Sequence, residues 1–179
     1  MKTKTILFFT LIPVFAGCDL IKDASKVTIS TELTASVPIE VVSSGKKSVN
    51  QTEIINAIDF TKTQDLTLAS NPDIEPYLSK IDEINLNSLI VTVTGLGSGQ
   101  TINSISLDVT GVGNIFTQTD ITMNNNSFTP VIASGKLDLV AAKLSSDKKI
   151  TFTVSGSASG PMTFTVGLNF DASVVASAL

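Results

Sequence analysis

The chain has 179 residues and a formal net charge of −4, with 12 lysines, 16 acidic residues, no arginine and no histidine. Without histidine it lacks the base of Ser-His-Asp and Cys-His catalysis and the imidazole ligands of common zinc sites. An acidic chain without arginine also lacks the cations that bind phosphates bidentately, so we expect no nucleic-acid partner.

The first residues have the layout of a secretory signal. Lys2 and Lys4 precede an uncharged run over residues 6–17, and the one cysteine of the chain, Cys18, follows directly. A helix needs about 20 apolar residues to cross the hydrocarbon core of a membrane, and this run is shorter. The pattern therefore predicts a cleaved signal peptide over residues 1–17 rather than a permanent transmembrane helix.

The residues at the end of this run, Phe15-Ala16-Gly17-Cys18, resemble the lipobox of bacterial lipoproteins, although Phe15 stands where that motif usually has leucine. The resemblance implies cleavage before Cys18 by signal peptidase II and attachment of acyl chains such as palmitate. Two or three chains anchor a protein far more firmly than one, because each buried methylene contributes about 0.8 kcal/mol. The alternative is a free thiol behind an ordinary signal peptide.

The expected location is the bacterial cell envelope, with a lipid anchor. Asp19 resembles the inner-membrane retention signal of enteric lipoproteins, whereas other phyla sort by different rules. We expect the outer membrane rather than the inner one and leave the leaflet open. Residues 18–25 would be the lipidated N-terminus and tether, and residues 26–179 one domain, because a chain of this size can bury a single sizeable core.

Residues 27–41 alternate apolar and polar side chains, which predicts a strand with one buried face. Pro38 cannot donate a hydrogen bond to a neighbouring strand, so this strand should lie at a sheet edge or break there. An exposed edge would be a natural place for another chain, such as a second envelope protein, to add a strand. A turn over 43–47, a strand or helical turn over 51–59 and a short extended piece over 66–68 should follow.

Two short helices are predicted. The sequence Asn71-Pro72-Asp73-Ile74-Glu75 has an Asn cap, a proline at the first helical position and acids in the first turn, which predicts a helix from residue 71 to about 81. A second helix should span residues 136–144, because four apolar side chains fall on one helix face: Leu137, Val140, Ala141 and Leu144.

The remaining pattern predicts strands. The apolar positions of residues 82–94 switch from even to odd numbers, which indicates a bulge near Ser88. Alternating strands follow, and their glycine-rich links should be hairpin turns rather than phosphate loops, because no helix follows them. A terminal hairpin should turn at Ser159-Gly160-Pro161. The predicted segments are strands 105–109, 115–121, 150–154 and 162–174, with turns at 95–99 and 111–113.

Six to eight strands and two short helices without βαβ alternation predict a mainly β fold, an antiparallel β-sandwich. Candidate functional residues are few. Tyr77 is the one tyrosine and tryptophan is absent, so the aromatic platforms common in sugar binding have no support. Asp120 with Asn124, Asn125 and Asn126 is the cluster closest to a calcium site. The candidate catalytic carboxylates are Asp73 with Glu75, Asp82 with Glu83, Asp108, Asp120, Asp138 and Asp171.

Together these features favour a non-enzymatic envelope lipoprotein with a structural or interaction role, for which we expect no catalytic residue, no metal and no cofactor. Two alternatives stay open. A carrier would hold a small apolar ligand in a continuous cavity between the sheets. A carboxylate-dependent glycoside hydrolase would bring two acids to roughly 5 to 10 Å from each other across a cleft.

Overall fold

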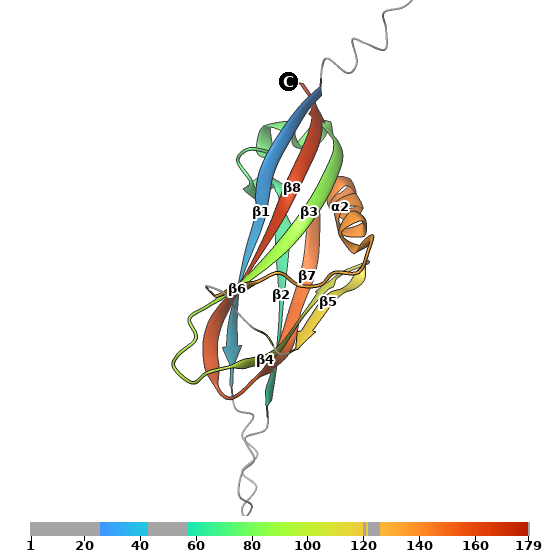
Figure 1. The fold of residues 1–179 in the computed structure, drawn as a ribbon. Helices are drawn as coiled ribbons and strands as arrows, with labels where there is room; N and C mark the ends of the chain where they lie inside the picture. Colours follow the sequence, from blue (N-terminus) through green and yellow to red (C-terminus); the bar gives the residue numbers. More distant parts are fainter. Residues whose placement is uncertain (1–25, 43–56, 120, 122–125, 179) are drawn as a thin grey trace, which may run out of the picture.

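A computed structural model of the chain describes residues 26–42, 57–119, 121 and 126–178. The predicted signal peptide, lipobox, tether and 43–47 turn lie outside the described residues. The mainly β prediction is confirmed: two antiparallel four-stranded sheets pack face to face, with a helix along one side (Figure 1). No helix in the described part of the chain combines the length and hydropathy required to cross a membrane.

The first sheet has the strand order β1-β8-β3-β6 and brings the two ends of the chain together. Lys26 lies opposite Ser177 at one end of the β1–β8 pair, and Val41 lies opposite Met162 at the other. The strands are β1 (Lys26–Val41), β8 (Met162–Ser177), β3 (Ile81–Thr94) and β6 (Ser127–Phe128).

Two local predictions for this sheet are confirmed. The strand with Pro38 is the outermost strand of its sheet, and its register with β8 runs without a break past Pro38 and Thr165. In β3 the register shifts between Leu86 and Ser88, which leaves Asn87 as the extra residue of a bulge. The change of phase in the apolar pattern therefore located the irregularity to within one residue.

The second sheet has the order β2-β7-β4-β5. The strands predicted within 105–109, 115–121 and 150–154 are present here. The strand predicted over 51–59 overlaps the observed strand β2 at Ile58 and Asp59, and residues 51–56 lie outside the described part. The strands are β2 (Ile58–Thr67), β7 (Lys149–Ala158), β4 (Ile102–Val109) and β5 (Gly113–Thr119).

The predicted terminal hairpin is wrong in its pairing, although both of its strands exist. β7 is a central strand of the second sheet and β8 a central strand of the first, so the turn at 159–161 carries the chain between sheets. The glycine loop 95–99 likewise crosses from β3 to β4 in the other sheet. The alternating pattern shows which side chains are buried. It does not show the partner of a strand, because the same side chains are buried whether the two strands form a hairpin or lie in different sheets. The turn at 111–113 does join paired neighbours, β4 and β5.

The second predicted helix is confirmed as α2 (Lys136–Asp147), three residues longer than expected. The first is wrong in type: the chain forms two short 3-10 helices, η1 (Leu68–Ser70) and η2 (Glu75–Lys80). The predicted Asn71 cap is also wrong: η2 begins after Ile74 without a side-chain cap, and Asn71 Oδ1 instead accepts a hydrogen bond from the Asp73 amide at 2.9 Å in an Asx turn before the helix. Pro76 has no amide hydrogen to donate to a residue four positions earlier, which interrupts an α-helix that would begin at Asn71.

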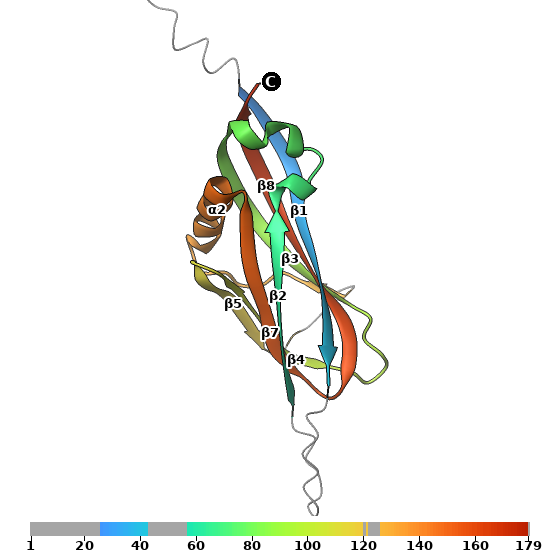
Figure 2. The same ribbon diagram turned by 180° about the vertical axis from the view of Figure 1, so that it is seen from behind.

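The space between the sheets is filled by apolar side chains, and no polar or charged side chain of the described residues is buried. Phe152, Phe164 and Phe170 are among its largest fully buried members. They occupy the region in which an apolar ligand would have to bind. α2 packs against β3 and β7, with its buried Val140 and Leu144, and covers that side of the sandwich (Figure 2).

Candidate functional site

The hollows at the surface of the described residues include three shallow ones, and two of these follow the free edge of β1. One of about 280 Å³ lies between β1 and residues 70–73. Another of about 480 Å³ lies beside Pro38 and Glu40 of β1 and Lys62 of β2. The third, about 280 Å³, lies between β3 and α2. Each has a mixed lining of polar and apolar groups.

A ring of hydrogen bonds fastens the segment after η1 to the free edge of β1. Asn71 Nδ2 donates to the Glu32 carbonyl oxygen at 3.0 Å and to Thr31 Oγ1 at 3.1 Å. The Thr31 hydroxyl donates to Asp73 Oδ2 at 3.1 Å, and the Asp73 amide donates back to Asn71. Asp73, a candidate catalytic acid, is therefore part of a structural contact, and its sequence partner Glu75 lies in the first turn of η2.

The third hollow is where the structure brings candidate acids together. Asp82 and Glu83 of β3 and Asp138 of α2 line it, and all three are exposed. Asp82 lies 3.8 Å from Lys26 Nζ, and Glu83 accepts a hydrogen bond from Asn85 Nδ2 at 2.9 Å. Asp138 lies in the first turn of α2, where the helix dipole favours an acid. A glycosidase general acid is instead a desolvated carboxyl, so this cluster has the character of a charged surface.

The other candidate acids lie apart from that cluster. Asp171 on β8 accepts a hydrogen bond from Asn87 Nδ2 at 3.1 Å, and Asp108 on β4 lies 3.4 Å from Asn114 Nδ2. These strands belong to different sheets. Of the predicted calcium cluster only Asn126 is described, at a φ of 62°. Within residues 26–42, 57–119, 121 and 126–178, no three acidic or cysteine side chains are placed to share a metal ion.

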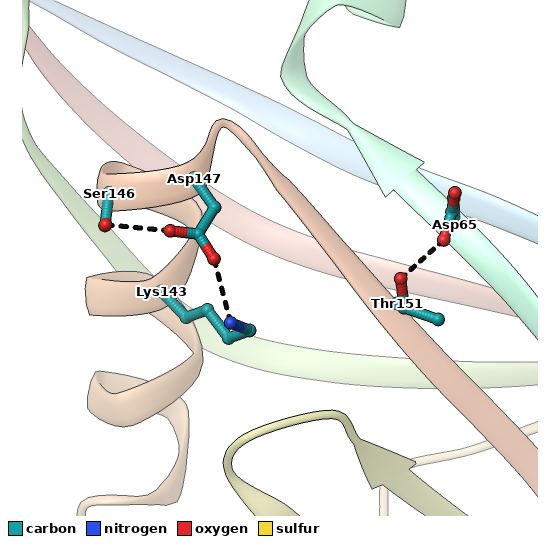
Figure 3. A network of polar contacts seen from close by, with 5 residues as sticks. All are labelled: Asp65, Lys143, Ser146, Asp147 and Thr151. Carbon is teal, nitrogen blue, oxygen red and sulfur yellow. Dashed lines mark hydrogen bonds and ion pairs between the residues drawn. The ribbon is translucent and has the colours of Figure 1, made fainter.

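Two carboxyls that the sequence analysis did not single out have pKa values below the ordinary 3.8 (Figure 3). The pKa of Asp65 is lowered first by the Thr151 hydroxyl, which donates at 2.6 Å, and then by Lys149 at 3.1 Å. The pKa of Asp147 is lowered chiefly by Lys143 at 2.8 Å. Both groups hold their charge more firmly than usual, which suits a surface ion pair and not a proton donor.

The outer face of the second sheet carries short hydroxyl side chains in register across all four strands. Thr61, Ser155, Ser106 and Thr117 form one row, as the strand pairings place each opposite the next. Hydroxyls bond one another between strands, for example Ser106 to Thr117 at 2.9 Å. Such a face is well solvated and presents many donors and acceptors without a large side chain. Tyr77 lies elsewhere, half-buried in η2.

Comparisons with known proteins add little to this geometry. No protein-family model matches the chain, and no curated protein matches its sequence. Among solved structures, a chain of Desmodium yellow mottle tymovirus is similar over 96% of this chain and 95% of its own, at 11% sequence identity and a TM-score of 0.29. The description of the chain as an antiparallel β-sandwich rests on its own strand order.

Proposed function

We propose that the chain is a bacterial envelope lipoprotein, in which Cys18 carries the lipid and the β-sandwich acts at the membrane surface as a non-enzymatic structural or interaction module. The observation that carries the proposal is the sequence Phe15-Ala16-Gly17-Cys18 at the end of a short uncharged run. Cys18 is also the one thiol of the chain, so no other cysteine competes for acylation.

The geometry of the sandwich suits an anchor at one end. β1 begins at Lys26, eight residues after Cys18, a distance of at most about 28 Å for an extended chain. The strand then runs about 50 Å to Val41, because each residue of a strand advances about 3.3 Å. The turn at 159–161 and the loop at 95–99 lie at this far end (Figure 1). A tethered domain of this shape would present its sheet faces and far loops to other envelope components.

The charges support a binding or structural role in preference to acid–base catalysis. Removal of Lys2 and Lys4 with the signal peptide would change the formal charge of the chain from −4 to −6. The candidate acids near α2 are exposed, and the two perturbed carboxyls, Asp65 and Asp147, favour their ionised forms.

The proposal is tested by expressing the full chain in a bacterium with radiolabelled palmitate, with and without the signal peptidase II inhibitor globomycin. The wild type should incorporate label, and globomycin should cause an unprocessed form to accumulate. Cys18→Ala should lose the label, whereas the neighbouring control Ser25→Ala should behave like the wild type. A wild-type chain that takes up no label and is processed equally well with globomycin would refute the proposal.

A further inference from the structure

The free edge of β1 is the longest strand edge of the sandwich. β1 has 16 residues and pairs on one side with β8, whereas the edge strands of the second sheet, β2 and β5, have 10 and 7. An exposed strand edge is a template on which another chain can add a strand. The free edge of β1 should therefore either be blocked or pair with a strand of another chain.

The hydrogen bond from Asn71 shows which residues of β1 face its free edge. The Glu32 carbonyl accepts from Asn71 and so points away from β8. The amide and carbonyl of one residue point to the same side of a strand, and the side alternates at each residue. Because the β1–β8 register contains no shift, every even-numbered residue of β1 faces the free edge. Pro38 is one of them, and it has no amide hydrogen to donate.

We propose that Asn71 and Pro38 together block strand addition to β1 between Glu32 and Pro38, with residues 71–73 acting as a latch over Glu32. Lys26, Thr28 and Ser30 also face the free edge and lie outside this block. A strand that pairs with residues 32–38 would have to donate a hydrogen bond to the Glu32 carbonyl, which already accepts one from Asn71, and would have to accept one from the amide of residue 38, which is a proline and has no amide hydrogen. Thr34 and Ser36 are the two edge-facing residues between these points, so an incoming strand could form hydrogen-bonded pairs with this part of β1 at those two residues alone.

The neighbouring edge strand carries a third obstacle. Lys62 of β2 lies on the same side of its strand as the buried Phe60 and Leu66, yet it is exposed beside Pro38 and Glu40. A charged side chain on the core-facing side of an edge strand is a recognised way to discourage edge-to-edge pairing. The block therefore extends across the side of the sandwich where β1 and β2 lie next to each other.

Opening this block converts β1 into a strand acceptor for a second copy of the chain. Two copies of β1 then pair antiparallel through residues 32–38 around a two-fold axis near Ala35. This inference does not depend on acylation of Cys18, because it rests on contacts within the sandwich. It also directs any natural partner away from residues 32–38 of the β1 edge.

The test compares the full chain in detergent micelles with the double variant Asn71→Ala, Pro38→Val, using native mass spectrometry and residue-resolved amide exchange. The matched control, Asn85→Ala with Pro161→Val, removes the same residue types at exposed positions in β3 and in the turn at 159–161. We expect a monomeric wild type and control, and a dimeric double variant in which the Thr34 and Ser36 amides exchange about tenfold more slowly than in the wild type.

Two results would overturn the proposal. One is a double variant that keeps the strand signal in circular dichroism and stays monomeric as its concentration rises. The other concerns the wild type alone, so it applies even if the double variant does not fold. If the wild-type Thr34 and Ser36 amides are protected while those of Leu33 and Ala35 exchange quickly, the assignment of the free edge is wrong.

Discussion

The ring of Phe60 in β2 meets the ring of Phe164 in β8 edge to face, with centroids 5.3 Å apart and planes at 83°. The two strands belong to different sheets, so this contact joins the sheets near their edge. Phe60 also lies opposite Gly156 of β7, where an added Cβ would come within 2.7 Å of the ring and overlap the Ser104 carbonyl oxygen. The glycine thus makes the space that the ring occupies.

Replacing Phe60 with alanine should lower the free energy of unfolding by about 3 kcal/mol, because a buried ring and its aromatic partner are lost. Denaturant titration followed by circular dichroism measures the change. Thr61→Ala, one residue further along β2 and exposed, is the control and should shift the unfolding free energy by less than about 0.5 kcal/mol. Equal losses for the two variants would contradict the role given to Phe60.

Gly156→Ala should destabilise the protein by about 1–3 kcal/mol, since the new methyl group must displace either the Phe60 ring or the β4 backbone. Gly160 offers a matched control, because no atom lies within 4 Å of a Cβ built there. Gly160→Ala should leave the unfolding midpoint nearly unchanged or raise it slightly. A Gly156→Ala chain as stable as the wild type would show that the close approach is relieved without cost.

The alternating pattern predicted the strands well and their partners poorly. It located β1, β8 and the bulge at Asn87, because burial of one face forces a period of two. It could not show that Lys26 lies opposite Ser177, since this pairing of the first and last strands leaves no local signal. The turn at 159–161 indicated a reversal of the chain, but a reversal fits both a hairpin and a crossover.

The contacts around Asn71 illustrate the same limit for the candidate site. The residue types predicted a helix cap at Asn71, whereas the structure has an Asx turn there, in which Asn71 Oδ1 accepts from the Asp73 amide. The other half of the side chain bonds Glu32, 39 residues earlier, which depends on how the sheets pack. Asp65 and Thr151 likewise meet only because β2 pairs with β7.

The packing of α2 predicts unequal effects for two leucines of the same helix. Leu144 is fully buried against the sandwich, whereas Leu139 is 54% exposed. Leu144→Ala should cost about 2–5 kcal/mol of unfolding free energy, and Leu139→Ala less than about 1 kcal/mol. Thermal or denaturant unfolding of the two variants checks this. Similar losses would mean that α2 does not use Val140 and Leu144 to cover the side of the sheets.

The lowered pKa values of Asp65 and Asp147 predict a loss of stability in acid. A carboxyl whose pKa is lower in the folded state stabilises the fold above its unfolded pKa, near 3.8, and loses this contribution as the pH falls through the folded value. Removing the main donor, in Thr151→Val, should raise the pKa of Asp65 towards 3.8 and leave that of Asp147 unchanged. Carboxyl NMR titration measures both, and an unmoved Asp65 would contradict the assigned cause.

The most direct test of the proposed lipoprotein is intact-mass analysis of the chain purified from bacterial membranes, followed by fragmentation of its N-terminal peptide. The account predicts a protein that begins at Cys18 and carries a diacylglyceryl group on that sulfur. A protein found with an unmodified Cys18 thiol, or with residues 1–17 still attached in a strain with active signal peptidase II, would contradict it.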